Sequence, residues 1–227
     1  MSATPALALD HLVIAAATLA QGVAWCTQTF GIAPAAGGSH PMMGTHNALF
    51  GIASARFPKA YAEIIAIDPG LPAPAHPRWF DLDDAALQHR LVHAPELVHW
   101  VARCDDIAAA RTALHDAGID CGEITRAERA TPRGPLRWHI TVRADGRRAL
   151  AGAAPALIAW GDVHPTDSLA TSGVQLEALT AAVPELLALW PAALGRDPSR
   201  SAAPLTAVFG TPRGAVTLSA AAPRAQR

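Results

Sequence analysis

An internal repeat constrains the fold of this chain more than any other feature. The segment from Leu7 to Ile32, LALDHLVIAAATLAQGVAWCTQTFGI, reads like the segment from Pro95 to Ile119, PELVHWVARCDDIAAARTALHDAGI. Each opens with a short apolar run that contains one histidine, continues into an amphipathic stretch and closes on a glycine. Short apolar runs bounded by turn or cap residues indicate strands, and an amphipathic stretch followed by glycine indicates a helix.

The residues at the predicted helix ends support this interpretation. Thr18 precedes the first helix, and Asp105 or Asp106 precedes the second. Threonine and aspartate are favoured N-caps because their side-chain oxygens accept hydrogen bonds from the first free backbone N–H groups. Gly31 and Gly118 follow the helices, where a glycine commonly ends a helix. Both copies therefore predict a strand, a capped helix and a glycine turn.

The copies remain alike beyond the helices. The first continues through GGSHPMMGTHNALFGIA to the apolar run AYAEIIAIDP, which ends at Pro69. The second continues through TPRGPLRWHITVRA to APALIAWGDVHP, which ends at Pro165. Each copy thus predicts a β-α-β-β-β module. A third, partial copy is predicted from GVQLEAL, a helix around 184–194, and the runs PLTAVFGT and GAVTLS, which are joined by a turn at 212–214.

The repeat and the composition of the connecting segments predict the domain organisation. The Pro-rich stretch DPGLPAPAHPR separates the two full copies, and an Ala-rich tail ends the chain. In chain order we expect a first module at 7–69, a linker at 70–94, a second module at 95–165, a partial third module packed on the others at 169–219, and a disordered tail at 220–227.

Composition limits the partners that this chain is expected to have. Lys+Arg number 18 against Asp+Glu 19, so the formal charge of -1 gives no reason to expect nucleic acid. The longest apolar stretch, 12–17, is far shorter than a membrane helix requires, and no basic segment of a signal peptide opens the chain. Three cysteines without a CxxC pair indicate neither a disulfide framework nor a structural zinc site. These features predict a cytoplasmic protein with no membrane partner.

Four motifs add a family resemblance to the repeat. They are DHLV at 10–13, GGxHPxxGTxN at 37–47, YxExIAxDP at 61–69 and PxLIxWxxxHP at 155–165. With these motifs the chain resembles the glyoxalase-like family of the vicinal oxygen chelate superfamily, which includes glyoxalases, extradiol dioxygenases, epimerases and antibiotic-binding resistance proteins. The resemblance implies an α+β fold in which tandem βαβββ modules form a cupped mixed sheet, here with an extra C-terminal half-module. It also implies a possible homodimer, because superfamily modules often dimerise.

The resemblance further implies a metal site. In the superfamily the ligands come from the first and fourth strands of each module, which here gives His11, Glu63 and His99. Aligning the closing prolines puts Ala159 at the fourth position, where alanine cannot bind a metal. Two imidazoles and one carboxylate suit a divalent ion such as Mn, Fe, Ni or Zn with open positions for substrate. Such an ion would polarise a carbonyl or stabilise an enolate.

A structural interpretation of the same residues remains open. A histidine within an apolar strand, such as His11, is commonly a hydrogen-bonded core residue. Trp100 follows His99, and a shift of one residue would turn His99 to the other face of the sheet. Glu63 would be costly to bury unless it were paired, protonated or ligated, and an arginine partner would remove the need for a metal.

The same alignment selects candidates for the rest of the site. His46 and His139 are candidate proton-transfer residues if they point into the cup. Asn47, Arg137, Trp138 and Trp79 are candidate substrate-binding residues. Aligning Gly44 with Gly134 places Arg137 opposite Asn47, where a guanidinium would suit a substrate carboxylate or phosphate. The competing interpretations are that Arg137 and His139 face outward, and that Trp79 merely seals the linker.

Three functions follow from these features. The first is a metal-dependent lyase, isomerase or dioxygenase that acts on a small oxygenated substrate, with His11, Glu63 and His99 as ligands. The second is a metal-free protein that holds an apolar or aromatic ligand in the same cup, and Ala159 favours it. The third is a structural subunit whose sheet edges pair with another chain.

Overall fold

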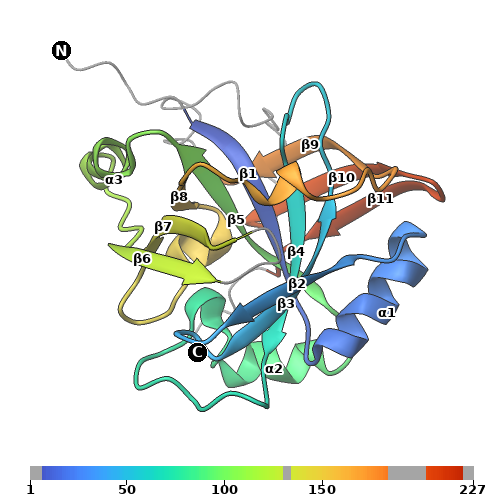
Figure 1. Cartoon of the computed structure of the whole chain (residues 1–227), viewed down its shortest axis with the longest axis horizontal. Coiled ribbons are helices and arrows are strands. Elements are labelled where there is room, and N and C mark those ends of the chain that lie inside the picture. Colours follow the sequence, from blue (N-terminus) through green and yellow to red (C-terminus); the bar gives the residue numbers. More distant parts are fainter. Residues whose placement is uncertain (1–6, 130–133, 184–202, 222–227) are drawn as a thin grey trace.

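The computed structural model describes residues 7–129, 134–183 and 203–221 (Figure 1). The elements of the first part of the chain are, in order, β1 (Leu7–Ala15), α1 (Leu19–Phe30), β2 (Ala35–His40), β3 (Thr45–Gly51), β4 (Tyr61–Ile67), the 3-10 turn η1 (Trp79–Asp81) and α2 (Ala85–Leu91). Those of the second part are β5 (Glu96–Cys104), α3 (Ile107–Asp116), β6 (Glu123–Arg129), β7 (Leu136–Val142), η2 (Ala149–Gly152), β8 (Ala156–Trp160) and η3 (Pro165–Asp167). The last strands are β9 (Gln175–Ala181), β10 (Leu205–Thr211) and β11 (Gly214–Ser219). The predicted helix at 184–194 and most of the predicted tail lie outside the described residues.

The described strands form a large sheet and a small sheet. The large sheet has eight strands in the order β2-β3-β4-β1-β5-β8-β7-β6, and the small sheet has three in the order β11-β10-β9. β1 and β5 are antiparallel at the centre of the large sheet, and each has a parallel neighbour, β4 or β8. The large sheet curls until its edge strands β2 and β6 contact each other (Figure 1). The predicted α+β fold with a cupped mixed sheet is therefore confirmed.

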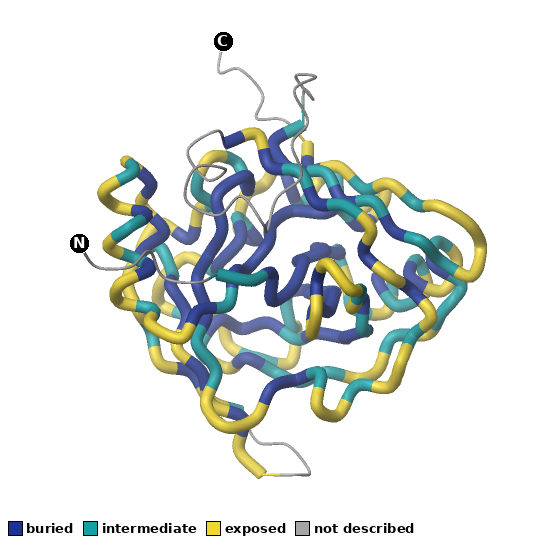
Figure 2. The backbone as a smooth tube through the Cα atoms, turned by 90° about the horizontal axis from the view of Figure 1, so that it is seen from above, coloured by how far each residue is buried: buried dark blue, intermediate teal, exposed yellow. Residues whose placement is uncertain are grey.

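Apolar side chains fill both faces of the large sheet, which explains why its central strands read as continuous apolar runs. On β1, Leu12 and Ile14 belong to the outer cluster, which packs against α1, α3 and the small sheet. Val13 and Ala15 belong to the inner cluster inside the cup. Figure 2 shows the result, with buried backbone through the middle of the molecule and exposed backbone in the peripheral turns.

The helix ends follow the predicted capping. Thr18 Oγ1 accepts the backbone N–H of Gln21 at 3.1 Å, and Gly31 ends α1 in the left-handed region with φ 77°. In the second copy Asp106, and not Asp105, is the N-cap of α3, because its carboxylate accepts the backbone N–H of Ala109 at 2.9 Å. These caps fix where each helix leaves its strand and returns to the sheet.

The C-terminal strands cover the outer face of the large sheet. Phe209 of β10 packs edge-on against Phe30 of α1, with ring centroids 5.2 Å apart. Arg213, in the turn before β11, donates to the carbonyl of Gln28 at 2.8 Å. The small sheet therefore completes the core behind α1 and leaves the inside of the cup to the first eight strands.

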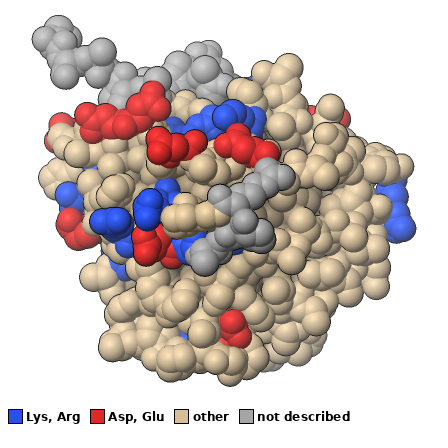
Figure 3. Space-filling view, in the orientation of Figure 1, with Lys and Arg blue, Asp and Glu red and all other residues tan. Residues whose placement is uncertain are grey.

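Charge is distributed without a strong excess of either sign. Figure 3 shows acidic and basic side chains side by side over one part of the viewed face, while most of the remainder is uncharged. The formal net charge is -1. In the described part of the chain, no helix is both long and apolar enough to cross a lipid bilayer.

Candidate functional site

A β-bulge on β1 places an acidic and a basic side chain together. Leu9 pairs with Ala102 of β5 and His11 with Val101, so Asp10 is an extra residue in the ladder. Successive strand residues normally face opposite sides of a sheet, but a bulge changes that alternation. His11 Nδ1 lies 2.7 Å from Asp10 Oδ1, and because a carboxylate only accepts, the imidazole donates. The other ring nitrogen, Nε2, is thereby left as the acceptor in neutral His11.

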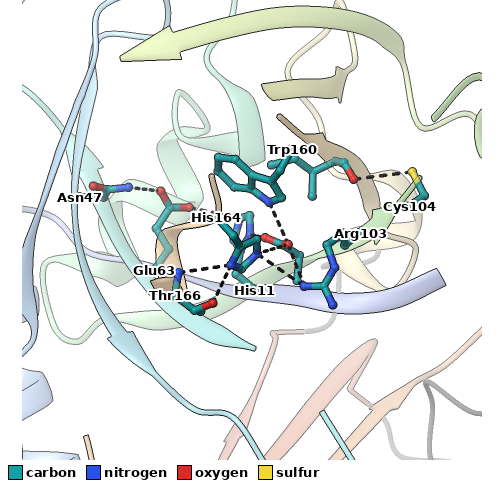
Figure 4. A network of polar contacts seen from close by, with 10 residues as sticks. His11, Asn47, Glu63, Arg103, Cys104, Trp160, His164 and Thr166 are labelled. Carbon is teal, nitrogen blue, oxygen red and sulfur yellow. Dashed lines mark hydrogen bonds and ion pairs between the residues drawn. The ribbon is translucent and has the colours of Figure 1, made fainter. Parts of the chain in front are cut away.

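Asp10 contacts four side chains of a buried network, and Figure 4 labels these four as His11, Arg103, Trp160 and His164. Its second oxygen accepts hydrogen bonds from His164 Nε2 and Trp160 Nε1, both at 2.9 Å, and lies 3.6 Å from the guanidinium of Arg103. Burial alone would raise the pKa of Asp10, but the hydrogen bonds from His11 and His164 outweigh it and hold the pKa below the ordinary aspartate value. A fully buried carboxylate thus stays ionised beside His11.

Glu63 of β4 is held in a defined orientation. Asn47 Nδ2 donates to Glu63 Oε1 at 2.5 Å, and Asn47 Oδ1 accepts the backbone N–H of Gly38 at 2.7 Å. The amide is therefore fixed at both ends. Glu63 Oε2 then lies 3.6 Å from His11 Nε2, and Glu63 is only 6% exposed. One carboxylate oxygen is anchored, and the other faces the imidazole (Figure 4).

Two glycines on β2 make room for this arrangement. A Cβ at Gly37 would overlap the side-chain oxygen of Asn47, and one at Gly38 would overlap the guanidinium of Arg129. The pairing of β2 with β3 also shifts register between Ala36 and Ser39, on either side of the glycines. Glycine is required where another group approaches the backbone this closely. The two glycines at 37–38 therefore leave the space that the side chains of Asn47 and Arg129 occupy.

These groups line a small cavity inside the cup. Its volume is about 30 Å³, and its wall contains polar groups beside a layer of aromatic rings. The polar and charged members are His11, His40, Asn47, Tyr61, Glu63 and Arg129, and the aromatic members are Trp79, Phe80, Trp138 and Trp160. A pocket with few convergent polar groups and apolar walls is the usual form of a small-molecule site.

Burial sets the protonation of two members of this wall. Tyr61 stacks on His11, with centroids 4.8 Å apart, and burial together with the carboxylates of Asp10 and Glu63 raises its pKa well above the ordinary value. Burial lowers the pKa of His40 to about 4, against the opposing effect of Glu63. The tyrosine is therefore protonated and His40 is uncharged at neutral pH.

A strained turn, η1, positions Trp79 and Phe80 in the wall of the cavity. Phe80 and Asp81 adopt left-handed backbone conformations with φ 60° and 59°, which are rare for residues other than glycine. Asp81 is fixed by Arg148, whose Nε donates to its carboxylate at 2.7 Å. Trp79 and Phe80 stack with centroids 5.3 Å apart, and Trp79 makes a T-shaped contact with His40 at a centroid distance of 5.2 Å. Strain of this kind is typical of functional sites.

The structure brings five of the nine predicted site residues to this cavity and places the others elsewhere. Those that line it are His11, Glu63, Asn47, Trp79 and Trp138. His46 lies on the opposite face of β3 from Asn47, 3.6 Å from Asp68. Arg137 and His139 of β7 are exposed, and Arg137 pairs with Glu128 at 3.3 Å. Strand alternation turns both outward while Trp138 between them points in.

His99 has a structural partner of its own. Its Nε2 accepts the backbone N–H of Ala156 at 3.1 Å, which ties β5 to β8. Nδ1 then carries the ring proton, so neither nitrogen of the neutral ring has a free lone pair. Burial lowers the pKa of His99 to about 3, and the Arg148 charge acts in the same direction. Its ring packs on Phe80, with centroids 5.2 Å apart.

The residues present do not fit the predicted three-ligand metal centre. Within the described ranges no three or more His, Cys, Asp or Glu side chains are grouped so that they could hold a metal ion. His11 and Glu63 face each other, but the lone pair of His99 that would complete the set is used by the Ala156 N–H. A metal centre needs its ligands deprotonated and free to coordinate.

The strand register corrects the predicted alignment of the two copies. Thr18 and Asp106, the N-caps of the helices that follow β1 and β5, correspond in the two copies, and the same offset relates His11 to His99 and Val13 to Val101. Glu63 pairs with Val13, and Ala156 pairs with Val101. Ala156, and not Ala159, is therefore equivalent to Glu63. The closing prolines misled the alignment because the segments between strand and proline differ in length.

The same register changes which residue of the second copy is equivalent to Asn47. Asn47 pairs with Ile65 of β4, two residues beyond Glu63, and Ile140 pairs with Ile158 of β8, two residues beyond Ala156. Ile140, and not Arg137, is thus the counterpart of Asn47 in the second copy. The second copy has neither the carboxylate nor the amide of the first.

Several members of the site were not selected from the sequence. They are Asp10, His40, Tyr61, Arg129, Trp160 and His164. All of them except Arg129 lie within the quoted motifs, so their positions were visible although their roles were not. The sequence around Arg129, EITRAER, has no regular alternation of apolar residues, so it does not indicate that this side chain faces the inside of the cup.

A family described as a glyoxalase-like domain matches residues 9–194. The comparison with curated proteins found no match. Among solved structures, a hypothetical protein from Staphylococcus aureus is 13% identical, with a TM-score of 0.55, over 94% of this chain and 86% of its own. At this identity the similarity concerns the fold alone.

Two further solved structures have lower TM-scores. Methylmalonyl-CoA epimerase from Mycobacterium tuberculosis is 17% identical, with a TM-score of 0.41, over 74% of this chain and 97% of its own. A methylmalonyl-CoA epimerase from Streptomyces coelicolor in complex with 2-nitronate-propionyl-CoA is 18% identical, with a TM-score of 0.42, over 70% of this chain and 99% of its own.

Proposed function

This chain belongs to the glyoxalase-like domain family of the vicinal oxygen chelate superfamily, and we propose that it is an isomerase or lyase that transfers a proton on a small oxygenated substrate. The observation that supports this most directly is the pair formed by Glu63 and His11, whose facing atoms are 3.6 Å apart in the wall of the cavity. Lyase and isomerase reactions of this kind need an acid–base pair of side chains.

Glu63 is the proposed base. Its Oε2 takes a proton from a substrate carbon next to a carbonyl group, and the C–H electron pair moves onto the carbonyl oxygen to form an enolate. Return of the proton to another face or atom gives an isomer, and loss of a leaving group from the neighbouring carbon gives a lyase product. Asn47, which is held by Gly38, keeps the other oxygen in place during the transfer.

His11 is the proposed second member of the pair. Its Nε2 accepts the proton from Glu63 and returns it to the substrate. Asp10 stabilises the resulting imidazolium because its carboxylate accepts the proton-bearing Nδ1 at 2.7 Å. A buried carboxylate plays the same part beside a catalytic histidine in serine hydrolases. The bonds from His164 and Trp160 keep Asp10 in position.

Exchange of carbon-bound hydrogen for deuterium tests the proposal with a panel of simple 2-oxo acids. Pyruvate, 2-oxobutyrate and phenylpyruvate are incubated with the protein in D₂O, and the loss of the C3 proton signals is followed by NMR. We expect faster exchange for at least one compound. Glu63→Gln is expected to lower the enzymatic rate by about 100-fold or more, as for removal of a general base.

Glu123→Gln provides the matched control, because this glutamate is exposed on β6 and pairs with Arg111 outside the cup. It should leave the exchange rate unchanged. Exchange that persists in Glu63→Gln, or that no compound in the panel shows, would contradict the proposal.

The aromatic wall favours one other function, a metal-free binding protein for a flat apolar ligand. The ring centroids of Trp138 and Trp160 are 5.4 Å apart, and Trp79 and Phe80 form a second pair in the same wall. Aromatic faces hold flat ligands by stacking. Tight binding of such a ligand, together with no proton exchange in the panel above, would support this function in place of the first.

A further inference from the structure

Arg129 is a cation in the cavity wall for which the described part of the fold supplies no partner. It ends β6 and lines the cavity that holds Glu63 and His40. Among the described residues its side chain forms no hydrogen bond or ion pair. The partly buried Arg148 and Arg143, by contrast, bind carboxylates at 2.7 and 2.6 Å. Arginine withdrawn from water is normally paired, so an unpaired one in a pocket indicates an anionic ligand.

The position of Arg129 is fixed by the closure of the cup. β6 and β2 are the two edges of the large sheet, and they contact each other. The guanidinium of Arg129 crosses this seam and rests on Gly38, where a Cβ would overlap it. Gly38 also donates to Asn47, so one residue positions both the guanidinium and the amide that holds Glu63. The cation and the proposed base are thereby held in one arrangement.

Two titratable groups of the cavity wall, His40 and Glu63, leave the guanidinium available. His40 is uncharged at neutral pH, because burial lowers its pKa to about 4 and the Arg129 charge acts in the same direction. Glu63 is not within ion-pair distance of Arg129 and is bound to Asn47. A ligand anion at Arg129 therefore meets a positive charge, while its neighbouring carbon is directed to the part of the cavity that contains Glu63.

A larger hollow begins where the cavity ends. It has a volume of about 320 Å³, compared with about 30 Å³ for the cavity. Arg129, Leu49 and Pro165 line both spaces, so the guanidinium lies at their junction. The wall of the hollow is mainly aliphatic and includes Ala35, Ala36, Leu49, Leu136, Val163 and Leu169. The cavity admits only a small polar group, whereas the hollow has room for a larger apolar remainder.

We propose that Arg129 binds the carboxylate of the substrate, and that the substrate is a carboxylic acid whose apolar chain or ring lies in the outer hollow. This inference rests on the proposed function for the identity of the reacting carbon, but carboxylate binding stands independently of it. A guanidinium offers two parallel N–H donors to a carboxylate, which fixes the orientation of the ligand as well as its charge.

Calorimetric titration with hexanoate and hexanamide tests this assignment. The two probes have the same chain and differ in charge. We expect hexanoate to bind the protein more tightly than hexanamide, and Arg129→Met to raise the Kd for hexanoate at least tenfold while leaving hexanamide binding unchanged. Arg129→Lys should restore part of the hexanoate affinity. Arg126→Met is the matched control, because Arg126 lies on the same strand with a side chain that is 68% exposed.

The results separate this inference from the proposed function. Glu63→Gln should retain hexanoate binding, so the loss of proton exchange in that variant leaves the anion site intact. If no proton exchange is found but hexanoate binding still depends on Arg129, the proposed reaction is refuted and the anion site is supported. The inference is overturned if hexanoate does not bind, if hexanamide binds equally well, or if folded Arg129→Met, checked by its melting temperature, binds hexanoate normally.

Discussion

Mild acid is expected to destabilise this protein through two buried histidines. His40 and His99 are 7% and 3% exposed, and burial lowers their pKa values to about 4 and about 3. In the unfolded chain a histidine has a pKa near 6.5. The unfolded state therefore binds protons between pH 7 and pH 5 that the folded state does not bind. Because stability decreases on acidification wherever the unfolded state binds more protons, both histidines lower the free energy of unfolding in this range.

The size of the effect follows from the two pKa values. For one group with an unfolded pKa of about 6.5 and a folded pKa of about 3 to 4, the linkage relation gives a loss of about 2 kcal/mol between pH 7 and pH 5. The two groups together give about 4 kcal/mol, a large part of the total stability of a typical domain. The loss continues below pH 5 until the folded-state pKa values are reached. Asp10, whose pKa is lowered in the folded state, adds to it only below about pH 4.

Urea unfolding at pH 7 and pH 5, followed by tryptophan fluorescence, measures the effect. His99→Gln should reduce the difference between the two pH values by about 2 kcal/mol, because glutamine offers an uncharged acceptor to the Ala156 N–H. His115→Gln is the control, since that side chain is 82% exposed and should leave the difference unchanged. A total difference below about 1 kcal/mol, or an equal difference in His99→Gln, would show that these histidines do not control the acid sensitivity.

Two further predictions concern the backbone that supports the site. Gly37→Ala should lower the free energy of unfolding by about 1–3 kcal/mol in urea titrations, because the new Cβ would overlap Asn47. Gly51→Ala is the control and should have little effect, since a Cβ at that position meets only an ordinary contact at 3.7 Å. Asp81→Asn should cost about 2 kcal/mol in the same titrations, because it removes the charge that holds its arginine partner and the strained turn. Glu128→Gln, at an ion pair whose two side chains are 57% and 59% exposed, should cost less than about 1 kcal/mol.

The fold could be predicted because its signals are local and repeated. Each copy carries a strand run, a capped helix and a glycine, and these are properties of neighbouring residues such as Thr18 and Gly31. The two faces of β1 are both covered, so its apolar run is continuous and its place at the centre of the sheet follows. What the sequence could not supply was register across the copies. Glu63 corresponds to Ala156 through pairing with Val13 and Val101, which are far apart in the chain.

The site was harder to predict because it depends on departures from strand alternation and on contacts between strands. Ordinary alternation would separate Asp10 from His11, but the bulge at Asp10 brings both into one network. Arg137 was the expected anion-binding residue, yet alternation on β7 turns it to solvent. Arg129, on the adjacent strand, reaches the cavity only because the curled sheet brings β6 to β2. No local pattern in a single segment encodes that closure.

The two copies contribute unequally to the candidate site, and this inequality explains why the residues present do not fit the expected set of His11, Glu63 and His99. The first copy supplies the facing pair His11 and Glu63. In the second copy the equivalent positions hold His99 and Ala156. The acceptor nitrogen of His99 already accepts a backbone N–H, and the alanine side chain has no atom that could coordinate a metal. The second copy instead supplies Arg129, Trp138 and Trp160, and the segment between the copies supplies Trp79 and Phe80. The first copy thus carries the proposed proton-transfer pair, and the proposed anion-binding arginine comes from the second copy, so the candidate site requires both copies around a single cavity.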